Sequence, residues 1–438
     1  MRNTPSQAYS SGRWRQRNRL WKAAGFASAA LCLALAAACS SSSSQSSTGS
    51  NTASNAGPST GPSAGSSTGS TAASGSPINV GTVQTASGSY GDPLWLTIAN
   101  VWAQWTNAHG GINGHPVQLT GVDDAGNPAQ ALSAVKGLVQ QHHVVAIIGS
   151  NTGTASSWLP YLEQNNIPLI GGAAAGGGLS DSFPSSLSVG SLVTASFQLD
   201  KQVGLTKVAE LLALGGAFNL STFEGELRQA AKSAGVGIVY AAGVSPTAPD
   251  YTAQCLSMKN AGADISSVGI SPSVTLNIIK TCLQQGYSGA FFTTSGLANP
   301  TWNTEAVLKG TRVYVLDDVW PFYQQSTPAQ KAYVQAIQQY APGMLTNPGY
   351  NAYVQDAWTG MEMFKAAAEA AGIAPNSTGA DVLNGLYKLH NETLGGLIGP
   401  VTFSKAAKVQ TANCYYVSEL ANGTWSSPLG ANAQCVTS

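Results

Sequence analysis

The chain has 438 residues, which is more than one hydrophobic core usually organises, so we expect two lobes. Its 20 Lys and Arg residues balance 20 Asp and Glu residues, and charged residues make up 9% of the chain, against about 25% in average proteins. Beyond the first 22 residues there is no cluster of Lys and Arg, which excludes nucleic acid as an expected partner.

Residues 1–38 have the pattern of an export signal. A basic stretch without acids precedes a small apolar run over residues 23–38, which is too short to span a bilayer comfortably. The run ends in "LALAAAC", which resembles the lipobox of bacterial lipoproteins, with Ala36 where that motif usually has Leu. The resemblance implies cleavage before Cys39 and a diacylglyceryl group on its sulfur, and so a protein held at the outer face of a bacterial cell membrane. The alternative is an ordinary secretory signal with an incidental Cys.

Residues 39–76 are expected to be the lipidated Cys followed by a flexible tether. From residue 40 onward the segment consists almost entirely of Ser, Thr, Gly, Ala, Asn and Pro, without a charge. Such a composition buries too little apolar surface to offset its ordering entropy. Its reach as a coil is on the order of 30 Å.

Apolar strands alternate with helical patterns from residue 77 onward. Asp92 and Pro93 mark the start of a helix in which Trp102 and Trp105 are core residues, and Pro160 should kink the helix after residue 154. Continuous apolar strands with helical crossovers predict an α/β fold of parallel sheets covered on both faces. The expected strands cover residues 78–84, 116–124, 144–150, 167–172, 207–216, 235–243, 265–272, 289–296 and 311–318, and a hairpin-like tail covers 401–404, 414–420 and 424–427.

The carboxyl ends of the predicted strands carry mostly Gly, Ser, Thr, Ala and Asn. Ligands bind at this edge of open parallel sheets. Residues 150–154 also lie where a helix N-terminus could bind an anion through free backbone N–H groups. The alternative is that Ser150, Asn151 or Thr152 simply caps its own helix.

Enzyme motifs are missing from the sequence. The stretch at residues 149–154 lacks the Lys of a phosphate-binding loop, and no GxSxG elbow accompanies His109 and His390, which a secreted hydrolase could use. The adjacent His142 and His143 make a poor metal pair, and Asp123 and Asp124 favour structural capping over catalysis. We therefore expect neither catalysis, nor a metal, nor a cofactor.

Four cysteines follow Cys39, and an even number in an exported protein predicts two disulfides. Cys255 and Cys282 lie in consecutive crossover helices, and Cys414 and Cys435 flank the terminal hairpin, so these are the expected pairs. Metal binding and a lone nucleophile at Cys282 are the alternatives, although no CxxC or Cys/His spacing supports a metal site.

Residues 106–140, "TNAHGGINGHPVQLTGVDDAGNPAQALSAVKGLVQ", resemble the signature region of Leu/Ile/Val-type, or type I, solute-binding proteins of ABC importers. The resemblance extends through "GSYGD", "PDYTAQ" and "LGGLIGPVTF". It implies two Rossmann-like lobes, joined by a three-crossing hinge, with a ligand cleft between them. By this likeness, residues 77–190 plus 322–394 form one lobe and residues 191–321 plus 395–438 form the other.

The resemblance also assigns ligand contacts. The helix N-terminus and the following turn would hold a ligand carboxylate, and two aromatic side chains would cover the ligand. Family members often have a hydroxyl where Gly153 and Ala175 stand, so backbone N–H groups would carry more of that contact. Trp320 and Phe322 follow a strand end near the hinge and are either core residues or ligand contacts. The implied contacts are Tyr90, Thr152, Gly153, Thr154, Ala173, Ala175, Phe218 and Ser295, with Trp320 as a further candidate.

The function implied is that of a monomeric, lipid-anchored protein that delivers a small organic ligand to ABC permease subunits. A ligand-sensing receptor subunit of the same fold and, less favoured, a secreted hydrolase are the alternatives. Family members that bind amino acids hold the ammonium group with a Glu where this chain has Ser295. We therefore expect a carboxylate or amide ligand without an ammonium group, unless another acid such as Asp318 or Glu224 substitutes.

Overall fold

The computed structural model describes residues 72–88, 91–173, 175, 181–214 and 220–436. The chain divides into two units, residues 1–66 and 67–438, and all described residues belong to the second unit. Cys39 and the predicted export signal therefore lie outside the described residues.

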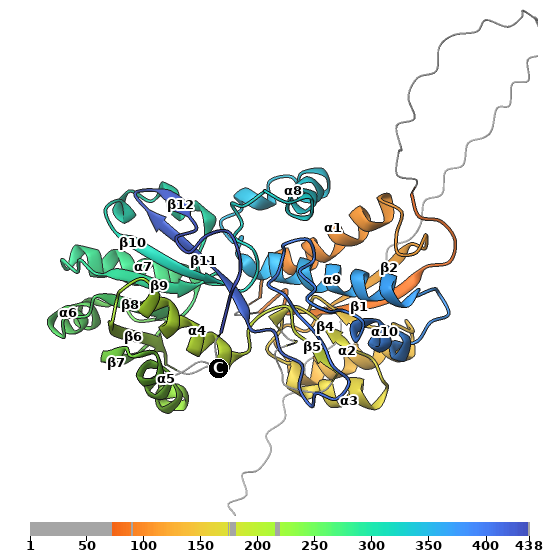
Figure 1. Cartoon of the computed structure of the whole chain (residues 1–438), viewed down its shortest axis with the longest axis horizontal. Helices are drawn as coiled ribbons and strands as arrows, with labels where there is room; N and C mark the ends of the chain where they lie inside the picture. The colour runs from red at the N-terminus through yellow and green to blue at the C-terminus, as the bar shows by residue number, and fades with distance from the viewer. Residues whose placement is uncertain (1–71, 89–90, 174, 176–180, 215–219, 437–438) are drawn as a thin grey trace, which may run out of the picture. The chain divides into compact units, whose positions relative to one another are not determined.

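The first sheet has five parallel strands in the order β2-β1-β3-β4-β5 (Figure 1). Its central strands are apolar on both faces, because helices cover both sides. The strands are β1 (Ile78–Gln84), β2 (Val117–Asp123), β3 (Ile147–Ile148), β4 (Leu169–Ile170) and β5 (Ser182–Phe183).

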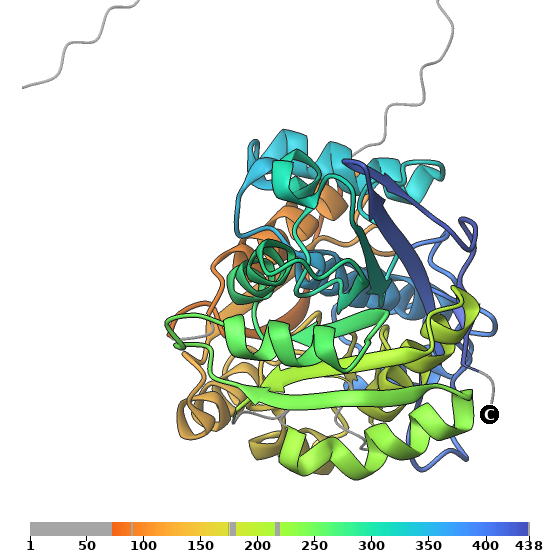
Figure 2. The same ribbon diagram turned by 90° about the vertical axis from the view of Figure 1, so that its left-hand side faces the viewer.

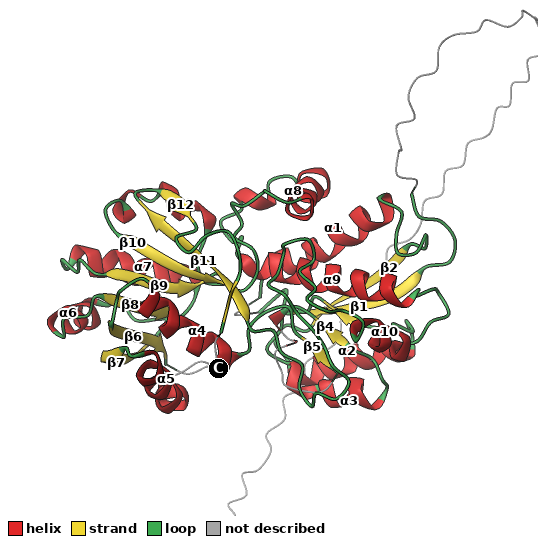
Figure 3. Ribbon diagram, in the orientation of Figure 1, coloured by secondary structure: helices red, strands yellow, loops and turns green. Residues whose placement is uncertain are grey.

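In the part of the chain that the structure describes, α-helices flank this sheet (Figure 3). Side chains of α1, α8, α9 and α10 pack in one core cluster, and side chains of α2 and α3 pack in another together with Val83 and Ile147. Trp102 of α1 is fully buried in the first cluster, and Trp105 packs against its edge. The helices are α1 (Leu94–Ala108), α2 (Pro128–Gln140), α3 (Leu159–Gln164), α8 (Pro328–Tyr340), α9 (Ala352–Ala371) and α10 (Gly379–Leu386).

The second sheet runs β12-β11-β10-β9-β8-β6-β7, with β13 paired to β11. Strands β6 to β10 are parallel, β11 pairs antiparallel with β10, and β12 pairs antiparallel with β11. The strands are β6 (Lys207–Ala213), β7 (Gly237–Val244), β8 (Ile265–Gly269), β9 (Ala290–Thr294), β10 (Arg312–Asp317), β11 (Cys414–Ala421), β12 (Thr424–Ser426) and β13 (Gln434–Cys435).

Helices α4 and α5 pack on one face of the second sheet, and α6 and α7 pack on the other (Figure 2). The chain passes between the sheets after β5, after β10 and before β11. The α/β class with two lobes that the sequence predicts is thereby confirmed. The helices are α4 (Val189–Gln202), α5 (Leu220–Ala234), α6 (Thr252–Asn260) and α7 (Pro272–Gln284), and short 3-10 turns cover Ala155–Ser157, Pro300–Thr304, Ala306–Leu308 and Met344–Thr346.

Local details differ from the sequence-based expectation in four places. Pro160 does not kink a helix, because it lies in the first turn of α3, where its missing N–H has no partner to lose. Strand β5 was not expected, and the predicted strand at 401–404 is reduced to one bridge between Glu392 and Val401. Residues 397–412 pack with the first sheet, where the ring of Phe403 contacts that of Phe183, although the sequence assigned them to the second lobe.

Two disulfides join Cys255 to Cys282 and Cys414 to Cys435. The first links α6 to α7 in the core of the second lobe, and the second links neighbouring residues of β11 and β13.

Removing the first disulfide should lower stability measurably. Its sequence separation of 27 residues predicts a loss of about 3 kcal/mol for the double variant Cys255→Ala/Cys282→Ala, since the cross-link restricts the unfolded chain. Differential scanning calorimetry should show a Tm lowered by roughly 5 °C. Peptide mapping that found free thiols or crossed pairing in the unaltered protein would contradict the assignment.

Candidate ligand-binding site

A buried carboxylate organises the strand ends of the first sheet. Asp124, which directly follows β2, is fully buried. Its Oδ2 accepts hydrogen bonds from the hydroxyls of Thr152, at 2.5 Å, and Thr154, at 2.6 Å. Its Oδ1 accepts from the hydroxyl of Thr85, at 2.7 Å, and from the N–H of Gly126, at 2.9 Å. Burial alone would raise the pKa of Asp124, but these four hydrogen bonds outweigh it and lower the pKa.

This network uses most of the groups that the sequence assigned to a ligand carboxylate. The hydroxyls of Thr152 and Thr154 are bound to Asp124, and the N–H of Thr154 donates to Thr152 Oγ1 at 3.0 Å. The N–H of Ala173 donates to Asn151 Oδ1 at 2.9 Å. Ala175 is buried in the core, and its N–H donates to the carbonyl of Gly172. The buried Ala175 is therefore corrected from a ligand contact to a structural residue, whereas the role of the exposed Ala173 as a contact stays a prediction.

Gly153 is a predicted contact that remains accessible. It is exposed, and a side chain built on it would meet nothing within 4 Å. Within the described residues, no hydrogen bond uses its N–H group. Gly153 therefore offers a backbone donor and open space at the edge of the first sheet, so its role as a ligand contact stays a prediction.

The aromatic predictions have different outcomes. Trp320 is 1% exposed and packs edge-to-face on Tyr333, with ring centroids 5.0 Å apart, in the core of the first lobe. Its carbonyl accepts from Gln355 Nε2 at 2.9 Å. Trp320 is therefore corrected from a ligand contact to a core residue. Tyr90 and Phe218 lie outside the described residues.

The start of helix α9 lies between the strand ends of both sheets. On the first-sheet side, Asn151 Nδ2 donates to the carbonyl of Tyr353 at 2.7 Å. On the second-sheet side, Asn299 Nδ2 donates to the carbonyls of Pro348 and Tyr350, at 2.6 and 3.0 Å, and the N–H of Ala352 lies 3.4 Å from the carbonyl of Ser295. The segment that enters α9 thus joins the two edges at which ligands bind in such folds.

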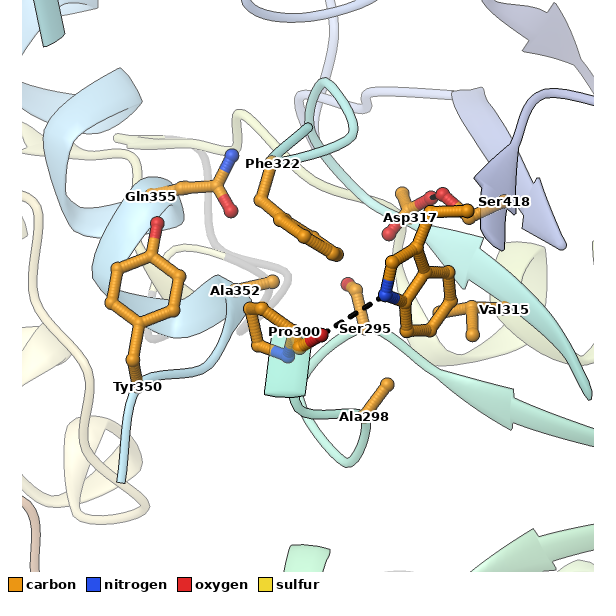
Figure 4. A pocket seen from close by; sticks show the side chains of 11 residues that line it. Ser295, Ala298, Pro300, Val315, Asp317, Phe322, Tyr350, Ala352, Gln355 and Ser418 are labelled. Carbon is orange, nitrogen blue, oxygen red and sulfur yellow. Dashed lines mark hydrogen bonds between the residues drawn. The ribbon is translucent and has the colours of Figure 1, made fainter. Parts of the chain in front are cut away.

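The Ser295 side chain lies in a small cavity beside this segment (Figure 4). Ser295 is 5% exposed, and among the described residues its hydroxyl has no partner. The cavity volume of about 10 Å³ is roughly what one water molecule needs. Asp317, which accepts a hydrogen bond from Ser418, and the ring of Phe322 close the cavity on the other side. Ser295 therefore lies at the junction of the sheets, in a space of about one water molecule, and its role as a ligand contact stays a prediction.

Two carboxyls lie near this junction, and neither was among the predicted ligand contacts. Asp356 of α9 is 2% exposed, its Oδ1 accepts from the Ser185 hydroxyl at 3.0 Å, and its Oδ2 has no partner among the described residues. Asp318, which follows β10, is partly exposed. Burial raises the pKa of both to about 7, and the charge of Asp318 contributes at Asp356. Burial, with both charges, also raises the pKa of Tyr353.

The two members of this acidic pair had sequence signals of unequal strength. Asp318 was named as an acid that could substitute for the missing Glu. Asp356 carried a weak signal, an acid within the apolar run that became α9. Glu224, the other substitute, forms an exposed ion pair with Arg228 within α5, where Glu224 Oε1 and Arg228 Nη2 are 2.7 Å apart.

Replacing Asp356 by Asn should change how stability depends on pH. A carboxyl whose folded pKa exceeds its unfolded value near 3.9 binds protons preferentially in the folded state, so its contribution falls as pH rises from about 4 to about 7. Asp356→Asn removes this pH-dependent loss of stability. The difference in Tm, variant minus unaltered protein, should therefore grow by a few degrees between about pH 4 and about pH 7 and stay level above pH 7. Thermal unfolding between pH 4.5 and 8.5 measures this. A constant difference would contradict the argument, and the exposed Asp250→Asn serves as the control.

The alternatives of a hydrolase and of a metal site require catalytic or metal-binding side chains, and a membrane span requires a long apolar helix. His109 Nδ1 lies 2.7 Å from the carbonyl of Trp105, and its ring stacks on that of Trp105, which is a surface packing arrangement. Among the described residues, no three His, Cys, Asp or Glu side chains gather as a metal ion would require. Within the same residues, no helix has the length and apolar character needed to cross a bilayer.

Comparison with known sequences identifies relatives along most of the chain. Leu/Ile/Val-binding protein homolog 3 of Brucella melitensis biotype 1 is 25% identical over 362 residues, which cover 78% of this chain and 90% of that protein. An amino acid binding protein of Pseudomonas aeruginosa is 38% identical over 64 residues, and this match spans 15% of the chain and 17% of that protein's length.

Solved structures share the fold. A solute binding protein of an ABC transporter from Rhodopseudomonas palustris, in complex with benzoate, has a TM-score of 0.62 at 16% identity and covers 82% of this chain and 98% of its own. A leucine binding protein from Thermotoga maritima has a TM-score of 0.63 at 14% identity. The match covers 81% of this chain and 99% of that protein's chain. Residues 77–424 match the family model described as periplasmic binding protein. With this match over most of its length and the two α/β lobes of the type I fold, the chain belongs to the periplasmic binding protein family.

Proposed function

We propose that this protein is an extracytoplasmic solute-binding lipoprotein that delivers a small organic ligand, either branched-chain amino acid-like or a related carboxylate or amide, to an ABC importer. The observation that carries the proposal is the meeting of both sets of strand ends at the start of α9, where Asn151, Asn299 and Ser295 converge. Ligand sites of open α/β sheets form at this edge. Family membership and the absence of a nucleophile motif in the sequence favour binding without turnover.

The polar groups around this junction set the ligand classes to be tested. Gly153 offers a donor for a carboxylate or a carbonyl, and Asp318 with Asp356 offers acids that could face an ammonium group. The Brucella relative is named for Leu/Ile/Val binding, and two Rhodopseudomonas palustris structures contain benzoate and 4-hydroxybenzoate. These names support a test with leucine, its keto acid and benzoate.

Titration calorimetry with these three compounds tests the proposal. We expect at least one to bind and to raise the Tm, because a ligand that binds only the native state stabilises it. The keto acid and benzoate should bind more tightly than leucine if Ser295 leaves the ammonium unpaired. If leucine binds best, Asp318→Asn should lower the affinity for leucine at least tenfold while leaving the affinity for the keto acid unchanged. Turnover of an ester or amide substrate, abolished by a His109 or His390 substitution, would contradict a binding role.

The lipid anchor is tested separately. In the bacterial host, Cys39→Ala should release the protein into the medium or block processing of the precursor, because the acylated sulfur would be absent. Fractionation and immunoblotting measure this, with Cys32→Ala in the apolar signal run as the matched control. Unchanged membrane retention of the Cys39→Ala protein would contradict the proposal. The role in import would be contradicted, in favour of a sensing role, if ligand uptake by cells were unaffected by deletion of the protein.

A further inference from the structure

The second lobe contains a pocket of about 250 Å³ between its sheet and helices α4 and α5. Its walls are mostly apolar, with Leu212, Leu227, Ile270 and Phe292 among the lining residues. Gly269 and Thr294, at the carboxyl ends of β8 and β9, and Tyr353 of α9 also line it. The pocket therefore reaches from the interior of the second lobe to the edge at which the proposed ligand site lies.

Among the described residues, one carboxyl side chain forms part of this apolar wall. Glu210 of β6 is 3% exposed, and it lies beside Ser267, its register partner on β8, which forms a hydrogen bond with it. No Lys, Arg or His is found among the described residues that line the pocket. Asp200 of α4 is 2% exposed, and among the described residues its Oδ1 has no partner. It adds a second buried carboxyl close enough to interact with Glu210.

Such an arrangement is costly unless a positive charge enters or a proton stays bound. Burial raises the pKa of Glu210 to about 7, and burial, followed by the charges of Glu210 and Asp264, raises the pKa of Asp200. Asp264 is engaged by the N–H groups of Thr206 and Lys207. Of the charged residues on α5, Arg228 is exposed and paired with Glu224. The described groups around Glu210 therefore add negative charge and no compensating cation.

We propose that this pocket of the second lobe binds the cationic end of an organic ligand, an ammonium group on an apolar body, with Glu210 as its counter-ion. The inference rests on the proposed function, since the pocket opens at the same strand ends. Leu212, Leu227 and Phe292 contact the apolar body, and the Glu210 carboxylate pairs with the ammonium, whose hydrogen bonds offset its desolvation. Within the proposed ligand class, this pocket favours ligands whose ammonium group is carried by an apolar body.

Hexylamine and hexan-1-ol test the charge requirement, because they share an apolar chain and differ in charge. Titration calorimetry on the full chain at pH 8 should show hexylamine binding at least tenfold more tightly than hexan-1-ol. Glu210→Gln should lower the affinity for hexylamine at least tenfold and change the affinity for hexan-1-ol by less than about threefold. For the unaltered protein, hexylamine affinity should fall about tenfold per pH unit below pH 7, because a proton then competes for Glu210.

Controls make each outcome decisive. Glu226→Gln removes an exposed acid of α5 that does not line this pocket and should leave hexylamine binding unchanged. If Glu210→Gln does not fold, Ser196→Phe, which fills the pocket from α4 and keeps Glu210, should abolish hexylamine binding. Equal binding of the alcohol and the amine, or amine binding that survives both variants, would overturn the inference.

Failure of this inference can be told apart from failure of the proposed function. If hexylamine does not bind but leucine, its keto acid or benzoate does, the cationic pocket is wrong and the solute-binding role stands. If none of these compounds binds, both are contradicted.

Discussion

Replacing Gly360 by Val should prevent stable folding. This glycine lies in the middle of α9, where a Cβ would come within 2.8 Å of the Cα of Gly171 and 2.9 Å of the Cα of Gly149. Both partners are backbone atoms, and both glycines adopt left-handed φ angles, +61° and +56°, so neither segment can move aside cheaply. We expect a loss of at least ~4 kcal/mol, with little soluble protein, and an intermediate loss of about 2 kcal/mol for Gly360→Ala.

A second helical glycine provides the matched control. Gly137 of α2 has only the end of the Gln141 side chain, at 4.0 Å, near the position of a Cβ. Gly137→Ala should therefore raise stability by roughly 0.5–1 kcal/mol, because alanine favours the helix. Urea denaturation of the variants measures these effects. Equal and small changes at both positions would contradict the close approach of α9 to β3 and β4.

Replacing Asp124 by Asn should destabilise the protein by about 2–4 kcal/mol and loosen the loop that carries Gly153. Both carboxylate oxygens of Asp124 accept two hydrogen bonds each, and an amide would place an N–H₂ donor against hydroxyls that are themselves donors. The folded pKa of Asp124 lies below its unfolded value near 3.9. Its contribution is therefore present above that pH and is lost as pH falls through the folded pKa.

The neighbouring Asp123 supplies the control for this effect. A single oxygen of Asp123 accepts from the N–H groups of Ala86, Ser87 and Ala125. The oxygen of an Asn can accept the same bonds, so Asp123→Asn should cost less than about 1 kcal/mol. Calorimetry at pH 7 compares the two, and ligand titration should show weaker binding for the Asp124 variant alone. Similar Tm values for both variants would show that the threonine hydroxyls do not depend on Asp124.

Local patterns predicted the elements of this fold well, because a strand or helix depends mainly on its own residues. The first strand, from Ile78 to Gln84, has the same bounds in the sequence reading and in the structure. Longer-range packing explains the differences. Residues 144–150 are all buried as expected for a central strand, yet only Ile147 and Ile148 pair in the ladder. The bulk of Phe403 places its segment against Phe183, a contact that no local periodicity encodes.

The candidate site was predicted less completely, because its chemistry depends on partners from several loops. The sequence identified Thr152 and Thr154 as polar residues at a strand end, but not that a carboxylate of this chain, Asp124, would occupy their hydroxyls. It also could not show that Asp356, one hundred and seventy-one residues after Ser185, would share a hydrogen bond with it. Small residues at strand ends predict where a site lies, whereas the direction of each donor follows only from the assembled loops.

Helix α9 is fixed at two points by interactions of different stiffness. Gly360 touches the backbone of Gly149 and Gly171 without clearance, whereas the segment before the helix is tied to the second sheet through the two hydrogen bonds of Asn299. Helix α9 is therefore held rigidly at Gly360, whereas the segment before it is held by hydrogen bonds that can stretch. A displacement of the loop after β9 must either stretch the Asn299 hydrogen bonds or rotate α9 about its contact at Gly360. We therefore expect a displacement at the second sheet to reach, through α9, the helices that cover the first sheet.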